Sequence, residues 1–303
     1  MSLDRLDYER CLEFILKLWY LWGGVTTDFR GSGVRRDIGK YIHDQIGGKL
    51  AEVAVQKIMR NSGVEVKLGF EKYTSREDMR QGDVEAVERD GGFDKPKLKV
   101  EIKDTKPSSQ WWLIPRNEWN DRAMDVYVLV NLGLPLDELI RYFRKSLKLT
   151  DPALERAIAE LTGLPAEIVA VYFREALLPL LSEFSPGDYL FGTDAFQPAR
   201  IIPTFTQSEQ VKEFTVEGIP NTFTASKEIQ HSLKQNPKSV SHYIRVFADV
   251  TISHPVLGDY RLSNGLYRCH PTLQSPLREA NFGVPKRRLS MDEETWQRFL
   301  HEI

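Results

Sequence analysis

The hydrophobic positions at the start of the chain recur at the three- and four-residue spacing of amphipathic helices. Residues 5–22 follow this spacing, and Gly23-Gly24 ends the segment. The pattern returns over residues 35–61, where Gly47-Gly48 predicts a break or kink. In its second half the apolar residues share one face, and Glu52 should sit at the edge of that face. Two N-terminal helices are therefore predicted.

The pattern then changes to the two-residue alternation of half-buried strands. Residues 64–73, 83–88 and 97–105 each alternate apolar with polar positions. The sequence Arg-Asp-Gly-Gly at 89–92 predicts a turn, which would make the last two strands a hairpin. The continuous apolar run at 126–132 is typical of a strand buried on both faces.

The remaining chain is helical in pattern up to about residue 182 and β-rich afterwards. Short helical patterns cover 116–124 and 136–148, and a longer one covers 152–182. After Pro186, glycine, proline and short β-like runs dominate, until residues 291–303 predict a closing helix.

These elements predict an α/β protein with a mixed central sheet flanked by helices and a C-terminal β-rich elaboration. A boundary near Ser185 would separate a core at 1–185 from a β-rich region at 186–303. The β-rich region could equally be an elaboration on one continuous domain.

The candidate chemistry lies on the predicted hairpin. Glu101 and Lys103 project to the same face of their strand, about 7 Å apart along it, and Asp104 projects to the opposite face. If the two strands run antiparallel, Asp83 at the start of one meets Glu101 near the end of the other. Two carboxylates and a lysine then converge at one sheet edge, where a divalent cation would relieve the repulsion between the acids.

The acidic-x-Lys pattern alone is weak, because it occurs three times: Glu65/Lys67, Glu101/Lys103 and Asp104/Lys106. Only Glu101/Lys103 follows an acidic residue at a preceding strand start across a possible hairpin. The alternative is a hairpin whose charged face is simply solvated.

The order of a helix with Glu52, two strands, a strand with Glu101 and Lys103, a helix and a buried strand resembles the PD-(D/E)XK nuclease superfamily, and within it the type II restriction endonucleases. The resemblance covers residues 36–132. It implies that Asp83 and Glu101 bind metal with a further contact at Ile102, that Lys103 positions water and the transition state, and that Glu52 assists. Gly82 stands where the superfamily often has proline.

The resemblance further implies a Mg²⁺-dependent endonuclease that cuts double-stranded DNA at a specific sequence. It implies a homodimer and a cognate DNA methyltransferase in the same restriction-modification system. Two alternatives remain: a structure-selective or repair nuclease, and a non-catalytic DNA-binding regulator.

Several segments carry residue types that bind DNA. Trp111 and Trp112 could pack against sugars or intercalate, or could be core residues. Residues 153–180 loosely resemble a helix-turn-helix, although a packed helical hairpin suits their apolar composition better. The candidate contacts to phosphates or base edges are Lys106, Ser108, Ser109, Gln110, Arg116 and Asn117, with Arg122 and Asn120 of compatible type, and the basic cluster Lys286, Arg287 and Arg288.

Composition sets the outer limits. The 303 residues carry 41 basic and 43 acidic side chains, and this near-neutral balance argues against an indiscriminate, histone-like DNA binder. Two cysteines, Cys11 and Cys269, cannot build a disulfide framework or a zinc knuckle by themselves. With no signal-peptide pattern at the N-terminus, we expect a cytoplasmic protein with reduced thiols.

Overall fold

The structure is a computed structural model that describes residues 1–21, 38–69, 82–147, 150–186 and 277–303, and the backbone of five strands between 191 and 271. The chain forms two compact units. The first contains Met1–Ser109, Asn117–Leu180 and Leu289–Ile303, and the second contains Gln110–Arg116 and Leu181–Arg288.

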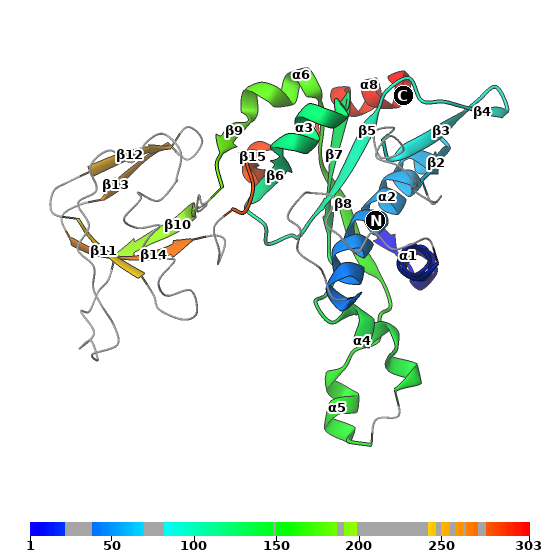
Figure 1. Cartoon of the computed structure of the whole chain (residues 1–303), viewed down its shortest axis with the longest axis horizontal. Coiled ribbons are helices and arrows are strands. Elements are labelled where there is room, and N and C mark those ends of the chain that lie inside the picture. The colour runs from blue at the N-terminus through cyan, green and yellow to red at the C-terminus, as the bar shows by residue number, and fades with distance from the viewer. Residues whose placement is uncertain are drawn as a thin grey trace. The chain divides into compact units, whose positions relative to one another are not determined.

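A mixed four-stranded sheet forms the centre of the first unit, with the strand order β1-β8-β7-β5 (Figure 1). Strands β5 and β7 run parallel, whereas β8 runs antiparallel to β7 and to β1. The bounds of these strands are Ser2–Leu3 (β1), Val100–Thr105 (β5), Val126–Leu132 (β7) and Leu164–Phe173 (β8). The prediction of an α/β protein with a mixed central sheet is therefore confirmed.

Strand β7 lies in the middle of this sheet because its side chains are apolar on both faces. All of its residues except Asn131 are buried, as expected for a central strand covered on two sides. Its neighbours on either side, β5 and β8, satisfy its backbone groups along its whole length. The prediction of a doubly buried strand at 126–132 is confirmed.

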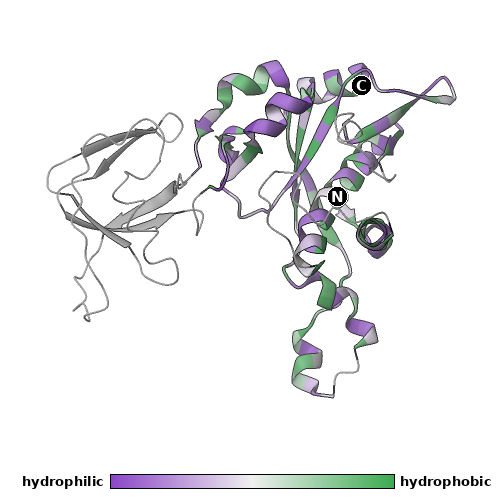
Figure 2. Ribbon diagram, in the orientation of Figure 1, coloured by the Kyte–Doolittle hydropathy of each residue, from purple (hydrophilic) through white to green (hydrophobic). Residues whose placement is uncertain are grey.

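Helices α1 (Arg5–Tyr20) and α2 (Ile38–Asn61) pack together beside the sheet. Both carry hydrophobic and hydrophilic residues, as their colouring in Figure 2 shows. Helix α1 begins at a capping box in which Asp4 accepts hydrogen bonds from the backbone of Leu6 and Asp7. Helix α2 contacts both β5 and β7, so the sheet lies against the helix that carries Glu52.

The predicted break at Gly47-Gly48 is wrong, because α2 runs through both glycines. The structure gives a different reason for Gly47. A Cβ atom there would lie 2.6 Å from Oδ2 of Asp104 on β5, so a side chain at this position would require the Asp104 carboxylate to shift. Nothing lies within 4 Å of a Cβ atom built on Gly48.

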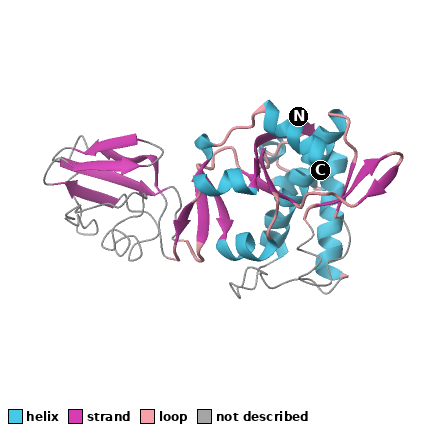
Figure 3. Ribbon diagram, turned by 90° about the horizontal axis from the view of Figure 1, so that it is seen from above, coloured by secondary structure: helices cyan, strands magenta, loops and turns pink. Residues whose placement is uncertain are grey.

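A second, three-stranded antiparallel sheet contains β2 (Val66–Leu68), β3 (Val84–Arg89) and β4 (Gly92–Asp94). Asp90 and Gly91 link β3 to β4 with φ values of 50° and 80°, the two positive angles of a type I′ turn. The hairpin extends away from the central sheet (Figures 1 and 3).

The turn and a strand within 97–105 were therefore predicted correctly, but the pairing of that strand was not. Strand β3 pairs with β4 and β2, whereas β5 pairs in parallel with β7, so the expected antiparallel pairing of residues 83–88 with 97–105 is wrong. The chain between β4 and β5 instead runs past the C-terminus, where the amide of Lys97 donates to the carbonyl of Ile303.

The prediction of helix throughout 152–182 is also wrong. Strand β8 occupies Leu164–Phe173, between α5 (Pro152–Ala157) and α6 (Arg174–Leu177). Most of β8 alternates buried with more exposed residues, and its β-branched and aromatic residues suit a strand. The suggested second helix of a helix-turn-helix at 153–180 is thus largely a strand of the central sheet.

The other helices of the first unit are short. Residues 116–124 contain α3 (Arg116–Arg122), and the C-terminus forms α8 (Glu293–Glu302), so both predictions are confirmed. Residues 136–148 contain only α4 (Glu138–Tyr142) and a 3-10 turn, Arg144–Ser146. No helix in the described ranges is both long and apolar enough to cross a membrane.

The second unit consists largely of strands in its described residues. Strand β15 (Asn281–Pro285) pairs antiparallel with β6 (Trp111–Pro115) on one side and with β9 (Ser182–Phe184) on the other. A second sheet has the order β10-β14-β11, and β12 pairs with β13. The bounds of the latter five are Phe191–Pro198 (β10), His242–Val246 (β11), Val250–His254 (β12), Gly258–Leu262 (β13) and Gly265–Pro271 (β14).

The division of the chain differs in detail from the boundary predicted near Ser185. The chain enters the second unit at Leu181, close to that position, but residues 289–303 belong to the first unit. Residues 110–116 belong to the second unit because β6 pairs with β15. Strand β6, which lies between β5 and α3 in the sequence, is therefore part of the β-rich unit.

Because α2 is continuous and Gly48 has free space around it, Gly48→Ala should stabilise the protein. Alanine lowers the cost of helix formation by about 0.5–1 kcal/mol relative to glycine, which corresponds to a rise in melting temperature of roughly 1–4 °C. Gly47→Ala is the matched control, since its methyl group meets Asp104 and should lose part or all of that gain. Equal gains in thermal melts of both variants would contradict the close approach at Gly47.

Candidate active site

Asp83 is tied to strand β5 by its backbone and by its side chain. Its amide donates to the carbonyl of Val100 at 2.8 Å, and its Oδ2 accepts a hydrogen bond from the amide of Ile102 at 2.6 Å. The start of β3 is thereby held against β5 although the two strands belong to different sheets. Asp83 and Glu101 do come together, by a different route from the predicted hairpin.

Gly82 makes this approach possible. It has a φ of 91°, and a Cβ atom there would lie 2.9 Å from the carbonyl oxygen of Val100. Proline cannot adopt this angle, because its ring holds φ near −65°. Gly82 therefore lets the backbone before Asp83 pass close to Val100 of β5.

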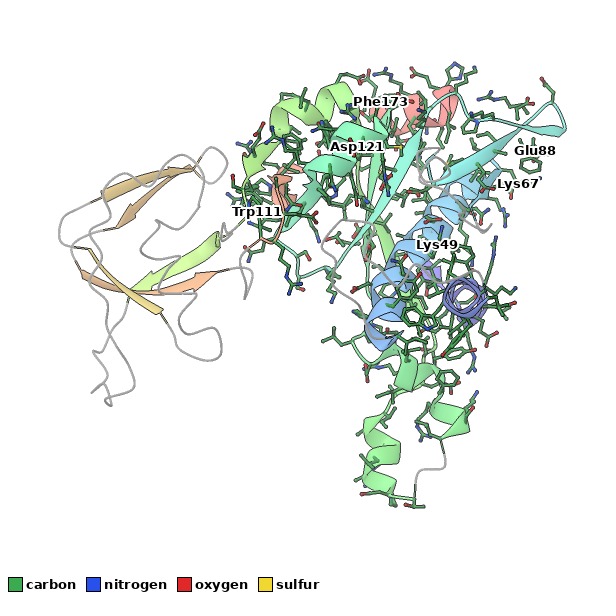
Figure 4. All side chains as sticks on the ribbon, viewed as in Figure 1. Lys49, Lys67, Glu88, Trp111, Asp121 and Phe173 are labelled. Atoms are coloured by element: carbon green, nitrogen blue, oxygen red, sulfur yellow. The ribbon has the colours of Figure 1, made fainter. Side chains whose placement is uncertain are left out.

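Glu52 faces the same region from helix α2. Its buried carboxylate is 2.8 Å from Nζ of Lys49, three residues earlier on the helix, and Lys49 also donates to the carbonyl of Gly69. Figure 4 labels Lys49 on α2. A buried carboxylate of this kind requires a cationic partner, which Lys49 supplies.

Glu101 and Lys103 form the third part of the site. Nζ of Lys103 lies 2.5 Å from Oε1 of Glu101, so the prediction that the two side chains share a face of β5 is confirmed. Asp104 points to the other face, toward Gly47 of α2. Helix α3 adds two more charges: Glu118 lies 2.9 Å from Lys103, and Nη1 of Arg122 lies 2.8 and 3.0 Å from the two oxygens of Glu101.

Two of the three carboxyl groups, those of Asp83 and Glu52, have raised pKa values, and the charge of Glu101 adds to both shifts. Burial, followed by the negative charge of Glu101, raises the pKa of Asp83 to about 6. Burial raises the pKa of Glu52 to about 8; Lys49 opposes this shift, and the charges of Asp83 and Glu101 add to it. Burial disfavours the charged form of Lys103, but Glu101 and Glu118 outweigh it and raise the pKa of that ammonium above its usual value.

The donor set suits a hard divalent cation, since carboxylate oxygens are the ligands that Mg²⁺ prefers. Burial raises the pKa values of Asp83 and Glu52 and neighbouring acids add to the shifts, so a nearby cation would favour the charged form of both. However, within the described ranges no three acidic, histidine or cysteine side chains are grouped closely enough to hold a metal ion. Glu101 is instead engaged by cations of the protein itself: Arg122 contacts both of its oxygens and Lys103 contacts one of them.

Three charged residues of this site were not assigned to it from the sequence. Lys49 and Glu118 were not predicted, and Arg122 was considered only as a residue type compatible with DNA. The available signal was helical spacing: Lys49 precedes Glu52 by three residues, and Glu118 precedes Arg122 by four. That spacing places each pair on one helix face, but only the fold shows which carboxylate the face meets.

The predicted DNA contacts at 106–110 follow β5 in a turn, and those at 286–288 begin at Lys286, which is hydrogen-bonded to Gln110. Lys106, Ser108 and Gln110 are exposed and Ser109 is half-buried; the amide of Ser109 donates to the carbonyl of Lys106. The amide of Lys286 donates to the carbonyl of Gln110 at 2.8 Å, at the end of the β6–β15 pairing. Residues Lys286–Arg288 form a single 3-10 turn in which Arg287 is exposed.

The remaining predicted contacts are partly engaged in the fold. Arg116 lies 3.3 Å from Glu183, and its guanidinium lies over the ring of Phe282. The side-chain oxygen of Asn117 accepts a hydrogen bond from the amide of Glu118.

The two tryptophans of β6 belong to the protein interior rather than to an exposed surface. Trp112 is buried, and the half-buried Trp111 packs edge-on against Phe184 with 5.4 Å between ring centroids. Their interpretation as core residues, the alternative to sugar contact or intercalation, is favoured by this packing.

The raised pKa values predict that the ion-free protein loses stability as pH rises. A carboxyl group with a higher pKa in the folded state binds its proton more tightly there. The loss should run from pH 3.8 to about 6 for Asp83, and from 4.5 to about 8 for Glu52. Asp83→Asn removes one of these charges and can still accept from Ile102.

In EDTA at pH 8, Asp83→Asn should therefore melt roughly 2–6 °C above the parent, and the difference should vanish near pH 4. Asp94→Asn, at an exposed position of β4, should show no such pH-dependent gain. A lower melting temperature for Asp83→Asn at pH 8 would show that its charge is compensated in the ion-free protein.

Comparison of the chain with protein-family models, with curated proteins and with solved structures found no match. The interpretation of the site therefore rests on its residues and their geometry. These are three buried or half-buried carboxylates and a lysine, brought together from α2, the start of β3, and β5.

Proposed function

We propose that this protein is a Mg²⁺-dependent endonuclease with a restriction-endonuclease-like core, which hydrolyses phosphodiester bonds of double-stranded DNA at a specific sequence. The observation that carries the proposal is the meeting of Asp83 with β5 beside Glu101 and Lys103, with Glu52 facing them from α2. The order of these elements is also the order that the superfamily resemblance implies.

Each residue has a chemical role in this proposal. Asp83 and Glu101 would hold the ion, with a further contact from Ile102, and Glu52 would assist them. Mg²⁺ supplies a water of lowered pKa and stabilises negative charge on the phosphate. Lys103, which the neighbouring acids keep protonated, orients the attacking water and bears part of the developing charge.

Sequence specificity would come from the second unit and the segment that leads into it. The polar turn at 106–110 follows the catalytic strand directly, and the basic turn Lys286–Arg288 begins next to Gln110. Such residues hold phosphates and position neighbouring side chains for base contacts. A homodimer on a symmetric site and a cognate methyltransferase in the same cytoplasmic restriction-modification system complete the proposal.

The chain contains its own control for the catalytic lysine. Lys103→Ala should reduce cleavage of unmethylated plasmid and phage DNA by roughly 10²-fold or more, because a charge that stabilises the transition state is lost. Lys67→Ala is the matched control, because Lys67 belongs to the same acidic-x-Lys pattern but is exposed and lies over the ring of Phe93. This substitution should leave cleavage unchanged. Lys67 is labelled in Figure 4. Cleavage is followed by gel electrophoresis with Mg²⁺ or EDTA.

The pattern of products separates the candidate functions. Discrete fragments that require Mg²⁺ and Lys103 support the proposal, and their ends give the recognition site. A smear, or cutting only of branched or damaged DNA, would favour a structure-selective or repair nuclease. Gel-shift binding without any cutting would favour a DNA-binding regulator, and full activity of Lys103→Ala would exclude the proposed catalytic role.

The basic turn gives a second, independent prediction. Replacing Arg287 and Arg288 by alanine should weaken binding to all DNA sequences and lower the slope of log affinity against log salt by about one to two. Arg156→Ala, at an exposed position of α5, is the control for a general loss of charge. An unchanged salt slope, measured by fluorescence anisotropy in Ca²⁺, would remove this turn from the DNA-binding surface.

A further inference from the structure

The predicted metal ligand Glu101 is occupied by a cation that belongs to the protein itself. Nη1 of Arg122 lies 2.8 Å from one oxygen of the buried Glu101 carboxylate and 3.0 Å from the other. An oxygen donor that accepts these bonds cannot also offer the same lone pairs to a metal ion. An ion that uses Glu101 must therefore displace Arg122 or share Glu101 with it.

Helix α3 holds Arg122 in this place through a second ion pair. Glu118 lies one helical turn before Arg122 and is 2.9 Å from Lys103. The two residues of α3 therefore form ion pairs with the two residues of β5: Glu118 with Lys103, and Arg122 with Glu101. In the described residues the site then contains four carboxylates (Glu52, Asp83, Glu101 and Glu118) and three cations (Lys49, Lys103 and Arg122).

Arg122 is the more exposed partner of this pair. Its side chain is 24% exposed, in contrast with 4% for Glu101, so of the two side chains it is Arg122 that borders solvent. Removing a buried carboxylate's partner without a replacement is costly, and a divalent ion is such a replacement. A guanidinium released beside a bound phosphodiester has the fork geometry that matches phosphate oxygens.

We infer that Arg122 is a positioning residue that holds Glu101 in the ion-free protein, is exchanged for the divalent ion, and then binds a phosphate of the DNA at the cleavage site. The inference rests on the proposed function, because it takes Glu101 as a metal ligand. It makes ion binding and substrate binding depend on one side chain: the ion releases the guanidinium, and the DNA phosphate keeps it away from Glu101.

The test is the affinity for Mn²⁺ without DNA, measured by electron paramagnetic resonance or calorimetry. Arg122→Met removes the competing charge and keeps much of the stem, so Mn²⁺ affinity should rise about tenfold, while cleavage of DNA in Mg²⁺ should fall at least tenfold. Arg122→Lys, which retains a charge, should lie between Arg122→Met and the parent in Mn²⁺ affinity. Arg141→Met breaks an arginine–aspartate pair on α4 and should leave Mn²⁺ affinity unchanged.

A second measurement covers the case in which Arg122→Met folds poorly. Melting temperatures with EDTA and with Ca²⁺ should show a larger rise on ion addition for Arg122→Met than for the parent, because the ion replaces the missing partner of Glu101. Glu101→Gln should abolish the tighter Mn²⁺ binding of Arg122→Met.

The outcomes distinguish the two levels of the argument. If the parent binds Mn²⁺ through Asp83 and Glu101 but Arg122→Met binds it equally or more weakly, the exchange is wrong and the proposed function stands. Full cleavage by Arg122→Met with tightened Mn²⁺ binding would remove the phosphate contact and overturn the second half of the inference. Absence of Mn²⁺ binding in the parent would overturn both the inference and the proposed function.

Discussion

The attachment of Asp83 to strand β5 is the interaction on which the candidate site depends. Two hydrogen bonds, from the Asp83 amide to Val100 and from the Ile102 amide to the Asp83 carboxylate, join the small β2–β3–β4 sheet to the central sheet. Gly82 is the residue that permits so close an approach. The attachment holds Asp83 against β5 although β3 and β5 belong to different sheets. Desolvation and the like charge of Glu101 act together on Asp83, and its pKa rises.

Buried charge explains the rest of the local architecture. Each of the three acids of the site has a cation within ion-pair distance or an amide on its carboxylate: Glu52 has Lys49, Glu101 has Lys103 and Arg122, and Asp83 has the amide of Ile102. Such pairs recover the cost of desolvation only in part and contribute little net stability. Apolar replacement of such pairs is often neutral or stabilising, which is why we propose a chemical role for the cluster.

The sequence was sufficient for elements whose own residues determine their structure. The helix at 5–22, the strand at 126–132, the turn at 89–92 and the C-terminal helix all follow from local apolar spacing or turn chemistry. It was insufficient where a distant partner decides. Strand β5 joins β7 in parallel across the intervening helix α3, and β8 is a strand because β7 offers it an open edge. The same limit applies to the site: Glu118 and Arg122 share a helix face, but only the fold brings that face to β5.

The two acidic-x-Lys patterns on strands β2 and β5 show what separates a site from a charged surface. Glu65, beside β2, is bonded to Arg60 on the surface, and this hydrogen bond lowers the pKa of its carboxyl group. Lys67 is exposed and lies over Phe93 rather than against a second acid. In the cluster around β5 the shift has the opposite sign, since burial and neighbouring acids raise the pKa values of Asp83 and Glu52. The same local pattern thus meets a single surface arginine in one place, whereas in the other Glu101 is paired with Lys103 and Arg122 and influences two buried acids with raised pKa values. We propose that this gathering of buried acids, rather than the pattern, is the property that would draw a divalent cation to β5.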